Sequence, residues 1–210
     1  WDWEKHIDHE NRTIQYLKDT VREIVGCICD TATALRNTFP VLTYRPDRDV
    51  YFITTQELED LYPDYTAKQR EDAFVKEHKT AFIMQIGGVL KSGEPHDGRA
   101  PDYDDWSLNG DIIVYYDVLD IALELSSMGI RVDEEALEKQ LKISGCEDRK
   151  EFAFHKALLN GELPYTIGGG IGQSRMCMFF LRKAHIGEVH SSVWSPEMIK
   201  ECEENNIYLL

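Results

Sequence analysis

Hydrophobic residues recur at helical spacing near the start of the chain. Most fall three or four positions apart, so they would form one stripe along a helix with 3.6 residues per turn. This pattern predicts a long amphipathic helix that packs on the face of a larger structure, and Pro40 marks its end. The residues of the stripe are Ile14, Leu17, Val21, Ile24, Val25 and Ile28.

Strands and helices are predicted to alternate between residues 50 and 86. The stretch 50–54 is rich in β-branched and aromatic residues, which favours a strand, and the apolar stretch 81–86 predicts another. Between them, a Thr is twice followed three residues later by Glu or Gln, a spacing typical of a capping box at the start of a helix. These pairs are Thr54 with Glu57 and Thr66 with Gln69.

The second half of the chain adds further strands and helices. The polar segment 91–110 is expected to be a functional loop between two strands, because long ordered loops often carry binding residues. The pattern predicts a single α+β domain over residues 1–210, with a mostly antiparallel sheet flanked by helices. Its further elements are strands over 111–116, 122–126 and 188–193, a turn at 127–129, a helix over 134–144 capped by Asp133, a helix between 148 and 161, and a helix over 173–184.

Composition narrows the class of protein. The chain has 210 residues, 42% of them hydrophobic and 29% charged, which is typical of one globular enzyme domain. Its formal net charge of −15 would repel a nucleic-acid backbone, and no stretch has the roughly 18 continuous apolar residues of a membrane helix. The five cysteines are an odd number and indicate reduced thiols of a cytoplasmic protein.

Three acidic residues stand at loop or strand positions bordered by residues that should be buried. These are Asp104, Asp111 and Glu124. Carboxylates beside an apolar sheet need a cation or a cationic ligand, and a magnesium nucleotide supplies one. They would equally suit salt bridges at the rim of the sheet, and both interpretations stay open on the residues alone.

Polar side chains near Glu124 extend this candidate site. Period-two alternation would place Glu124 and Ser126 on one face of their strand, and Ser127 would begin the following turn. Arg131 is predicted on the next strand, where an arginine usually meets a carboxylate through a bidentate fork. That carboxylate would be a substrate or Glu124 itself.

The glycine run Gly168–Gly170, followed by Gly172, indicates a ligand that lies directly against the backbone at a strand end. Arg175 then falls in the first turn of a helix, where a cation favours an anionic ligand such as triphosphate. The spacing fits neither a P-loop nor a dinucleotide-binding fingerprint. The alternative is a glycine-rich turn beside a core helix.

Two histidines are candidates for general bases or metal ligands, namely His96 in the polar loop and His185 after the last long helix. Neither has a second His or Cys at metal-binding spacing. The sequence therefore favours structural or solvent-facing roles for both.

Four long motifs closely resemble the aspartate–ammonia ligase family, in the same order. They are residues 99–106 (RAPDYDDW), 108–112 (LNGDI), 124–132 (ELSSMGIRV) and 167–175 (IGGGIGQSR). The likeness extends from Trp1 to about Trp194. The family is similar in turn to the catalytic domain of aspartyl- and asparaginyl-tRNA synthetases, which implies a class II aminoacyl-tRNA synthetase-like fold.

The resemblance also implies a role for each candidate residue. Arg175 would contact the adenine and triphosphate of ATP, and Glu124, Asp111 and Ser127 would hold Mg²⁺. Arg175, Glu124 and Asp111 are thus the expected catalytic residues. The expected substrate-binding residues are Asp2, Arg99, Asp104, Ser126, Ser127, Arg131, Gly168, Gly169, Gly170 and Gly172.

The implied activity is ATP-dependent synthesis of asparagine from aspartate and ammonia through β-aspartyl-AMP. A cytoplasmic homodimer is expected, with no nucleic-acid or membrane partner. An aspartyl- or asparaginyl-tRNA synthetase-like enzyme and a non-catalytic paralogue stay open as alternatives.

Two departures from the family pattern qualify the resemblance. Because the chain begins at Trp1, without Met, we expect that an N-terminal portion of the family domain, including part of the ATP site, precedes it. The connection between Trp106 and Leu108 is also shorter than is usual in the family.

Overall fold

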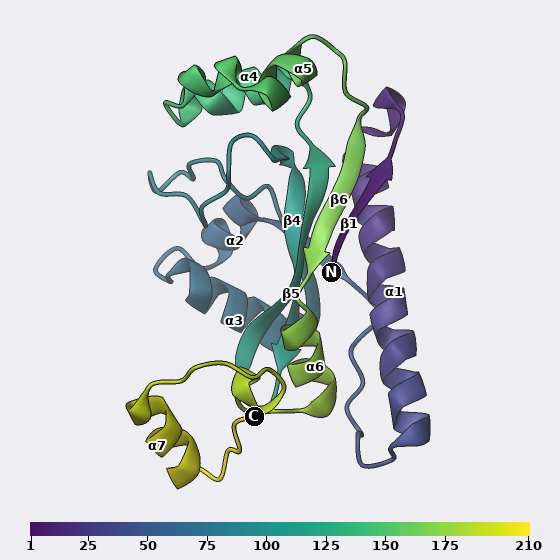
Figure 1. Ribbon diagram of the computed structural model, residues 1–210, viewed down its shortest axis with the longest axis vertical. Helices are drawn as coiled ribbons and strands as arrows, with labels where there is room; N and C mark the ends of the chain where they lie inside the picture. Colours follow the sequence, from purple (N-terminus) through teal and green to yellow (C-terminus); the bar gives the residue numbers. More distant parts are fainter.

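The computed structural model describes residues 1–210. A single six-stranded sheet runs through the centre in the order β1-β6-β5-β4-β3-β2 (Figure 1). All neighbouring strands are antiparallel except β2 and β3, which are parallel. The predicted α+β class is therefore confirmed. The strands are β1 (Asp2–His6), β2 (Tyr51–Thr54), β3 (Thr80–Met84), β4 (Asp104–Tyr116), β5 (Ile121–Arg131) and β6 (Thr166–Ile171).

Seven α-helices and three short 3₁₀ helices surround this sheet. The α-helices are α1 (Ile14–Thr38), α2 (Thr55–Leu61), α3 (Ala67–His78), α4 (Glu134–Ile143), α5 (Ala153–Leu159), α6 (Gln173–Leu181) and α7 (Pro196–Glu204). The 3₁₀ helices are η1 (His9–Asn11), η2 (Glu147–Glu151) and η3 (Ile186–Glu188).

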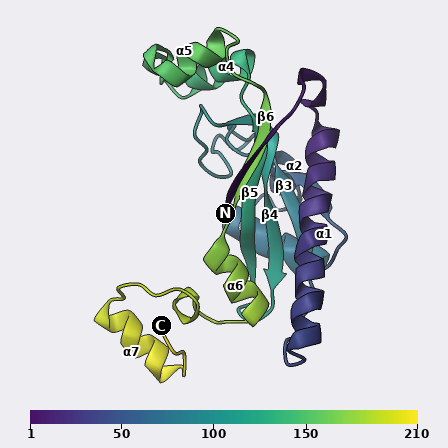
Figure 2. The same ribbon diagram turned by 45° about the vertical axis from the view of Figure 1, so that its right-hand side comes forward.

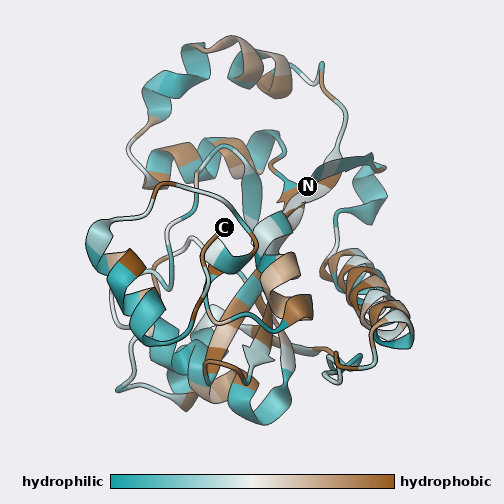
Figure 3. Cartoon of the chain, turned by 60° about the horizontal axis from the view of Figure 1, so that its bottom comes forward, coloured by the Kyte–Doolittle hydropathy of each residue, from teal (hydrophilic) through white to brown (hydrophobic).

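Helix α1 covers one face of the sheet along most of its length (Figures 1 and 2). Its residues Leu17, Val21 and Val25 are buried in one cluster with Ile112 and Met128 of the sheet. Figure 3 looks nearly along this helix and shows hydrophobic and hydrophilic residues sharing its turns. The predicted amphipathic helix is thus confirmed; it ends at Thr38, two residues before Pro40.

Helices α2 and α3 cover part of the opposite face (Figure 1). Both begin with the predicted capping boxes, in which Thr54 pairs with Glu57 and Thr66 with Gln69. Their apolar residues pack against strands β2 to β5. This layer leaves the β1–β6–β5 part of the same face to other side chains, which form the site described below. The buried residues of the layer are Ile53, Leu58, Phe74, Val75, Ala81, Ile83, Ile113 and Ala122.

The remaining helices lie at the two ends of the sheet. In Figure 1, α4 and α5 lie at the top, between β5 and β6 in the chain, and α6 and α7 lie near the bottom. Asp133 caps α4 as predicted, by accepting a hydrogen bond from the Ala136 amide. None of the helices combines the length and apolar composition that a membrane-spanning segment requires. All five cysteines are free thiols, as predicted.

Several predicted boundaries were wrong in the middle of the chain. The polar segment 91–110 is not a loop throughout, because β4 already begins at Asp104 and includes the short connection from Trp106 to Leu108. The predicted turn at 127–129 is absent. These residues pair with β4 on one side and β6 on the other, so hydrogen bonding across the sheet overrides their turn-like composition.

Boundaries in the last third also differ. The expected strand at 188–193 is replaced by η3 and irregular backbone, in which Glu188 accepts hydrogen bonds from the amides of Ala184 and His185. Val193 is 97% exposed, so no buried face stabilises a strand there. Helix α5 begins only at Ala153, after η2, and α6 ends at Leu181 because Arg182 adopts a left-handed conformation.

Candidate functional site

A row of side chains crosses four strands on the face opposite α1. The registers pair Asp2 with Gly170, Gly170 with Ser127, and Ser127 with Asp111. Directly paired residues project from the same face of a sheet. The Asp2 carboxylate, the Ser127 hydroxyl and the Asp111 carboxylate therefore lie in one line, with Gly170 between Asp2 and Ser127. The pairing brings together four residues that are far apart in sequence.

A second row lies beside the first and is formed by Glu4, Gly168, Gly129 and Asn109. A Cβ on Gly168 would lie 2.1 Å from Glu4 Oε2 and 2.5 Å from Arg131 Nη2, and one on Gly129 would lie 2.8 Å from Asp104 Cγ. These glycines therefore leave the space that the charged side chains occupy.

The glycine run lies within strand β6, and not at a strand end as expected. Gly168 and Gly170 face the site, because they alternate with Gly169 along the strand. A Cβ on Gly169 would lie 2.5 Å from Met128 Cβ, on the α1 side. Gly172 is the N-cap residue of α6, and it packs beside the Arg175 side chain.

Strand β5 contains a bulge that decides where Glu124 lies. Ile112 pairs with Ser126 and Ile113 with Glu124, so Leu125 is an extra residue on β5. The bulge places Glu124 on the same face as Ser127 and Asp111. The expectation that Glu124 and Ser126 share a face was therefore wrong. Ser126 is buried, and its hydroxyl donates to the Gly170 carbonyl oxygen at 2.9 Å.

Arg131 is the centre of an ion cluster at the end of β5. Its guanidinium donates to both Glu4 carboxylate oxygens, bonds Asp104, and lies 3.9 Å from the centroid of the Tyr103 ring. Burial raises the pKa of Asp104 although Arg131 opposes the shift. For Glu4, hydrogen bonds from Arg131 and Thr166 outweigh burial and lower the pKa. Two carboxylates thus share one arginine.

Asp111 and Arg99 form a second ion pair between β4 and the preceding loop. Burial is the main cause that raises the pKa of Asp111, to about 6, and the nearby Glu124 adds to it while Arg99 acts against it. Its Oδ1 atom is buried and has no hydrogen-bond partner. A buried oxygen without a partner is unfavourable, and a bound cation would satisfy it.

Glu124 and Arg175 form a third ion pair, which is accessible to solvent, with Arg175 Nη1 3.1 Å from Glu124 Oε1. Both side chains are almost half exposed, so this pair can exchange partners with a ligand. They line a cavity of about 370 Å³ together with Asp111. The cavity joins one acid from each of β4 and β5 with the arginine of α6.

The donor set fits a magnesium ion. Asp111 contributes an unpartnered carboxylate oxygen, Glu124 an accessible carboxylate, and Ser127 a hydroxyl on the same face. No group of three or more His, Cys, Asp or Glu side chains is arranged to hold a metal ion by itself. Mg²⁺ is usually held by only one or two carboxylates, with water and substrate phosphates completing its octahedron. Two carboxylates and a hydroxyl are therefore sufficient.

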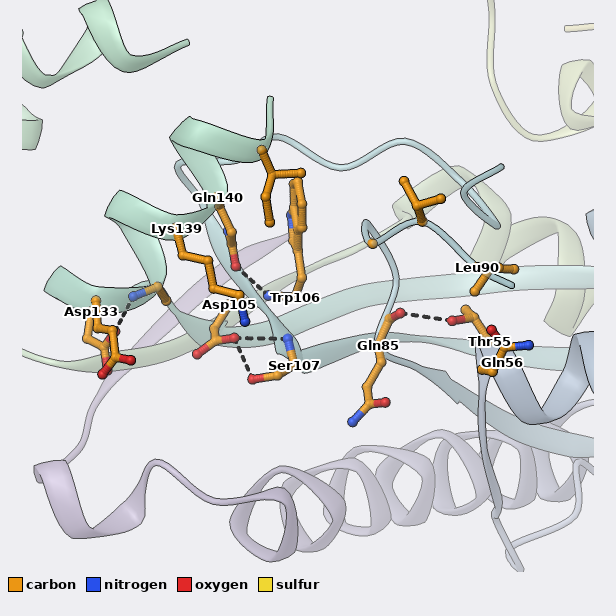
Figure 4. Close-up of a pocket in the computed structure, with 15 residues that line it drawn as sticks. Thr55, Gln56, Gln85, Leu90, Asp105, Trp106, Ser107, Asp133, Lys139 and Gln140 are labelled. Atoms are coloured by element: carbon orange, nitrogen blue, oxygen red, sulfur yellow. Dashed lines mark hydrogen bonds between the residues drawn. The ribbon is translucent and has the colours of Figure 1, made fainter. Parts of the chain in front are cut away.

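A larger cavity of about 530 Å³ lies between α4, the start of α2 and the segment after β3. None of the predicted site residues lines it. Figure 4 shows that its polar groups already bond one another: Gln140 accepts from the Trp106 amide, Asp105 from Ser107, and Thr55 donates to the Gln85 carbonyl. The smaller cavity is lined by Asp111, whose buried Oδ1 atom has no hydrogen-bond partner, and we place the candidate site there.

The site also contains residues that the sequence patterns did not single out. Glu4 and Tyr103 surround Arg131, and Lys68, Glu71 and Asp97 line the cavity of Asp111 and Glu124. Glu4 had one usable signal, because it stands two residues after Asp2 on a strand and so shares its face. The α3 residues had none, since their proximity depends on the packing of that helix.

Comparisons with known proteins show the family to which the chain is related. The sequence model of the aspartate–ammonia ligase family matches residues 1–206. A protein of Clostridium perfringens named aspartate–ammonia ligase is 61% identical over the whole chain, which covers 62% of that protein. One of Fusobacterium nucleatum with the same name is 58% identical, and the chain covers 64% of it. The chain thus spans less than two thirds of the length of these relatives.

Solved structures share the fold. Asparaginyl-tRNA synthetase from Pyrococcus horikoshii superposes with a TM-score of 0.61 at 16% identity, over 89% of this chain and 46% of the synthetase. The Entamoeba histolytica asparaginyl-tRNA synthetase in complex with asparaginyl-adenylate gives 0.60 at 16% identity, over 90% and 45%. The predicted class II synthetase-like fold is confirmed. With the family match over residues 1–206, the chain belongs to the aspartate–ammonia ligase family.

Proposed function

We propose that the full-length protein synthesises asparagine from aspartate and ammonia, using ATP and passing through β-aspartyl-AMP. The observation that carries the proposal is the alignment of Asp2, Gly170, Ser127 and Asp111 across one sheet face, next to Glu124 and Arg175. This surface combines oxygen ligands, an exchangeable arginine and backbone cleared of side chains. A nucleotide and a small amino acid need these features together.

The charges of the site suit aspartate, which carries one ammonium group and two carboxylates. Glu4 and Asp104 share Arg131, so that cluster has one carboxylate in excess and favours the ammonium group. Asp2 lies beside it on β1 and adds a further carboxylate. Arg99, paired with Asp111, is positioned to meet a carboxylate of the substrate. In this assignment Arg131 acts on aspartate by organising the acids around it.

Asp111, Glu124 and Ser127 would hold Mg²⁺, which supplies charge neutralisation on the phosphates when bound. Arg175 would release Glu124 and bond the triphosphate. An oxygen of the aspartate side-chain carboxylate then forms a bond to the α-phosphorus, and the bond to pyrophosphate breaks. Ammonia next forms a C–N bond at the side-chain carbonyl carbon, and AMP departs with the electron pair of the broken C–O bond. Arg99 and Arg175 offset negative charge in the first step.

A homodimer and a cytoplasmic location stay predictions from the family likeness. Two alternative functions can be distinguished from this proposal by the assay described below. A tRNA synthetase-like enzyme has support in the fold, but the net charge of −15 disfavours tRNA binding. A non-catalytic paralogue would keep the fold and bind ligands without turnover.

The test is an assay of full-length protein with aspartate, ATP, Mg²⁺ and ammonium. Asparagine, AMP and pyrophosphate are expected in equal amounts. Formation of ADP in place of AMP would contradict the proposed adenylate, and transfer of the amino acid to tRNA would favour the synthetase. Ligand binding without any product would favour the non-catalytic paralogue.

A further inference from the structure

The cavity of the candidate site has a second wall that the proposed steps do not use. It is formed by residues of α3 and by the loop between β3 and β4. His96 and Glu71 lie on this wall and are hydrogen-bonded to each other, and Asp111, Glu124 and Arg175 line the same cavity. A titratable pair thus shares the space in which the substrates would react.

His96 is held in one orientation by its neighbours. Its side chain is only 1% exposed, and its Nε2 atom lies 3.1 Å from Glu71 Oε1. A carboxylate only accepts hydrogen bonds, so Nε2 carries the hydrogen in the neutral ring. Nδ1 then has a free lone pair, and this atom is buried without any partner. An unpartnered basic nitrogen is unfavourable in a protein interior unless a ligand donates to it.

We propose that His96 is the general base that takes a proton from ammonium, with Glu71 as its positioning residue. This inference rests on the proposed function and adds the group that prepares its second substrate. Most ammonia in neutral solution is ammonium, which has no lone pair and does not attack a carbonyl carbon. A histidine oriented by a carboxylate is a common arrangement for removing such a proton.

The charges around His96 favour binding of the ammonium cation over uncharged ammonia. Four carboxylates and two cationic side chains line the cavity, and Arg99 from the loop bonds two of those carboxylates, Asp97 and Asp111. An acidic cavity concentrates ammonium, and a base within it then releases ammonia where it is needed. The charged groups that line the cavity with His96 are Lys68 and Glu71 of α3, Asp97 of the loop, Asp111 of β4, Glu124 of β5 and Arg175 of α6.

The proton balance is simple. The N–H bond of ammonium breaks, its proton passes to Nδ1 of His96, and the electron pair stays on nitrogen. The resulting ammonia forms the C–N bond of asparagine as AMP leaves. The attacking nitrogen loses one further proton, which passes to solvent or to the departing AMP, and His96 returns its proton to solvent.

The experiment compares two nucleophiles with the full-length protein. Hydroxylamine is uncharged at neutral pH and needs no initial deprotonation, and it gives aspartyl hydroxamate. The His96→Gln variant should lose about 10²- to 10⁴-fold in kcat/KM for ammonium, the range for general-base catalysis, but only severalfold for hydroxylamine. Aspartate-dependent pyrophosphate exchange should persist, which shows that the variant folds and activates aspartate.

His155 provides a matched control. It is also buried, its Nε2 lies 3.0 Å from Asp102 Oδ2, and its Nδ1 also lacks a partner, but it does not line the cavity. The His155→Gln variant should keep the wild-type ratio of ammonium to hydroxylamine activity. Equal losses with both nucleophiles in His96→Gln would overturn the proposal. Absence of pyrophosphate exchange in the wild-type protein would instead contradict the proposed function.

The wild-type pH profile decides the question even if His96→Gln does not fold. With an internal base, kcat/KM for total ammonia should stay nearly level between about pH 7 and pH 8.5, because ammonium itself is used. A tenfold rise of kcat/KM per pH unit would show that only free ammonia reacts, and would contradict the role of His96 as a general base. The Glu71→Gln variant should fall between wild type and His96→Gln, since the base is kept and its orientation is weakened.

Discussion

Glu124 and Asp111 lie on the same face of neighbouring strands because β5 holds one more residue than β4 at Leu125. Without that bulge, Glu124 would face α1, on the other side of the sheet. The bulge therefore joins the exchangeable Glu124–Arg175 pair to the buried Asp111 carboxylate. Bulges often redirect a side chain next to an active site, and this one produces the carboxylate pair proposed to hold Mg²⁺.

Replacing Arg175 should strongly reduce the activation of aspartate without unfolding the protein. Its side chain is almost half exposed, so Arg175→Ala removes little packing. We expect aspartate-dependent pyrophosphate exchange to fall by about 10²- to 10³-fold, as when a charge-stabilising donor is lost. Arg182→Ala is the control, because Arg182 pairs with Asp117 at the other end of α6. Retained exchange in Arg175→Ala would show that the α6 arginine is not part of the nucleotide site.

A methyl group at Gly168 should disturb the ion cluster of Arg131. Its carbon would lie 2.1 Å from Glu4 Oε2, so Gly168→Ala must displace charged side chains, and we expect a loss of about 1–3 kcal/mol in unfolding free energy with a higher KM for aspartate. Gly88→Ala is the matched control, because no atom lies within 4 Å of a Cβ there. Chemical denaturation measures both. Equal stability of the two variants would contradict the crowding at Gly168.

Features that depend on neighbouring residues could be predicted from the sequence, whereas the pairing of distant strands could not. The amphipathic helix, both capping boxes and the α+β class follow from local spacing, and the structure confirms them. The glycine run was singled out from the sequence as a binding element, which stays a prediction, and its arrangement in the middle of a sheet depends on pairing with β1 and β5, which are distant in sequence. Local composition carries no record of such partners.

The same limit explains the error at Ser126, and it explains why the pairing of His96 with Glu71 was not foreseen. Strict alternation assigned Ser126 to the face of Glu124, because a single extra residue in a strand has no reliable sequence signal. His96 was considered structural because no metal ligand stands near it in the chain. Its partner, Glu71, lies 25 residues away on α3, and only the tertiary packing shows that the pair lines the cavity.

Removing Arg131 should destabilise the fold strongly. The Asp104 side chain is 7% exposed, so Arg131→Met leaves a buried carboxylate without its cation, a change that typically costs about 3–5 kcal/mol. A second substitution, Asp104→Asn, should restore part of the loss, because it removes the unpaired charge. Urea denaturation of the single and double variants tests this. If the double variant is no more stable than Arg131→Met, the unpaired Asp104 carboxylate is not the cause of the lost stability.

Stability should depend on pH through Asp111. Burial raises its pKa from the ordinary 3.8 to about 6, so between these values the folded protein binds more protons than the unfolded chain. The free energy of unfolding therefore falls as pH rises through this window, by up to about 3 kcal/mol. Asp111→Asn abolishes this titration. Its stability relative to wild type should increase by that amount from about pH 4 to pH 7, and a constant difference would contradict the raised pKa.

The central claim, that the carboxylate of aspartate is activated by adenylation, is tested most directly by isotope transfer. Full-length protein is incubated with ATP, Mg²⁺, ammonium and aspartate that carries ¹⁸O in its side-chain carboxylate, and the products are analysed by mass spectrometry. We predict one ¹⁸O atom in AMP and none in pyrophosphate, because the carboxylate oxygen that attacks the α-phosphorus leaves with it. Label in inorganic phosphate, accompanied by ADP, would contradict the account.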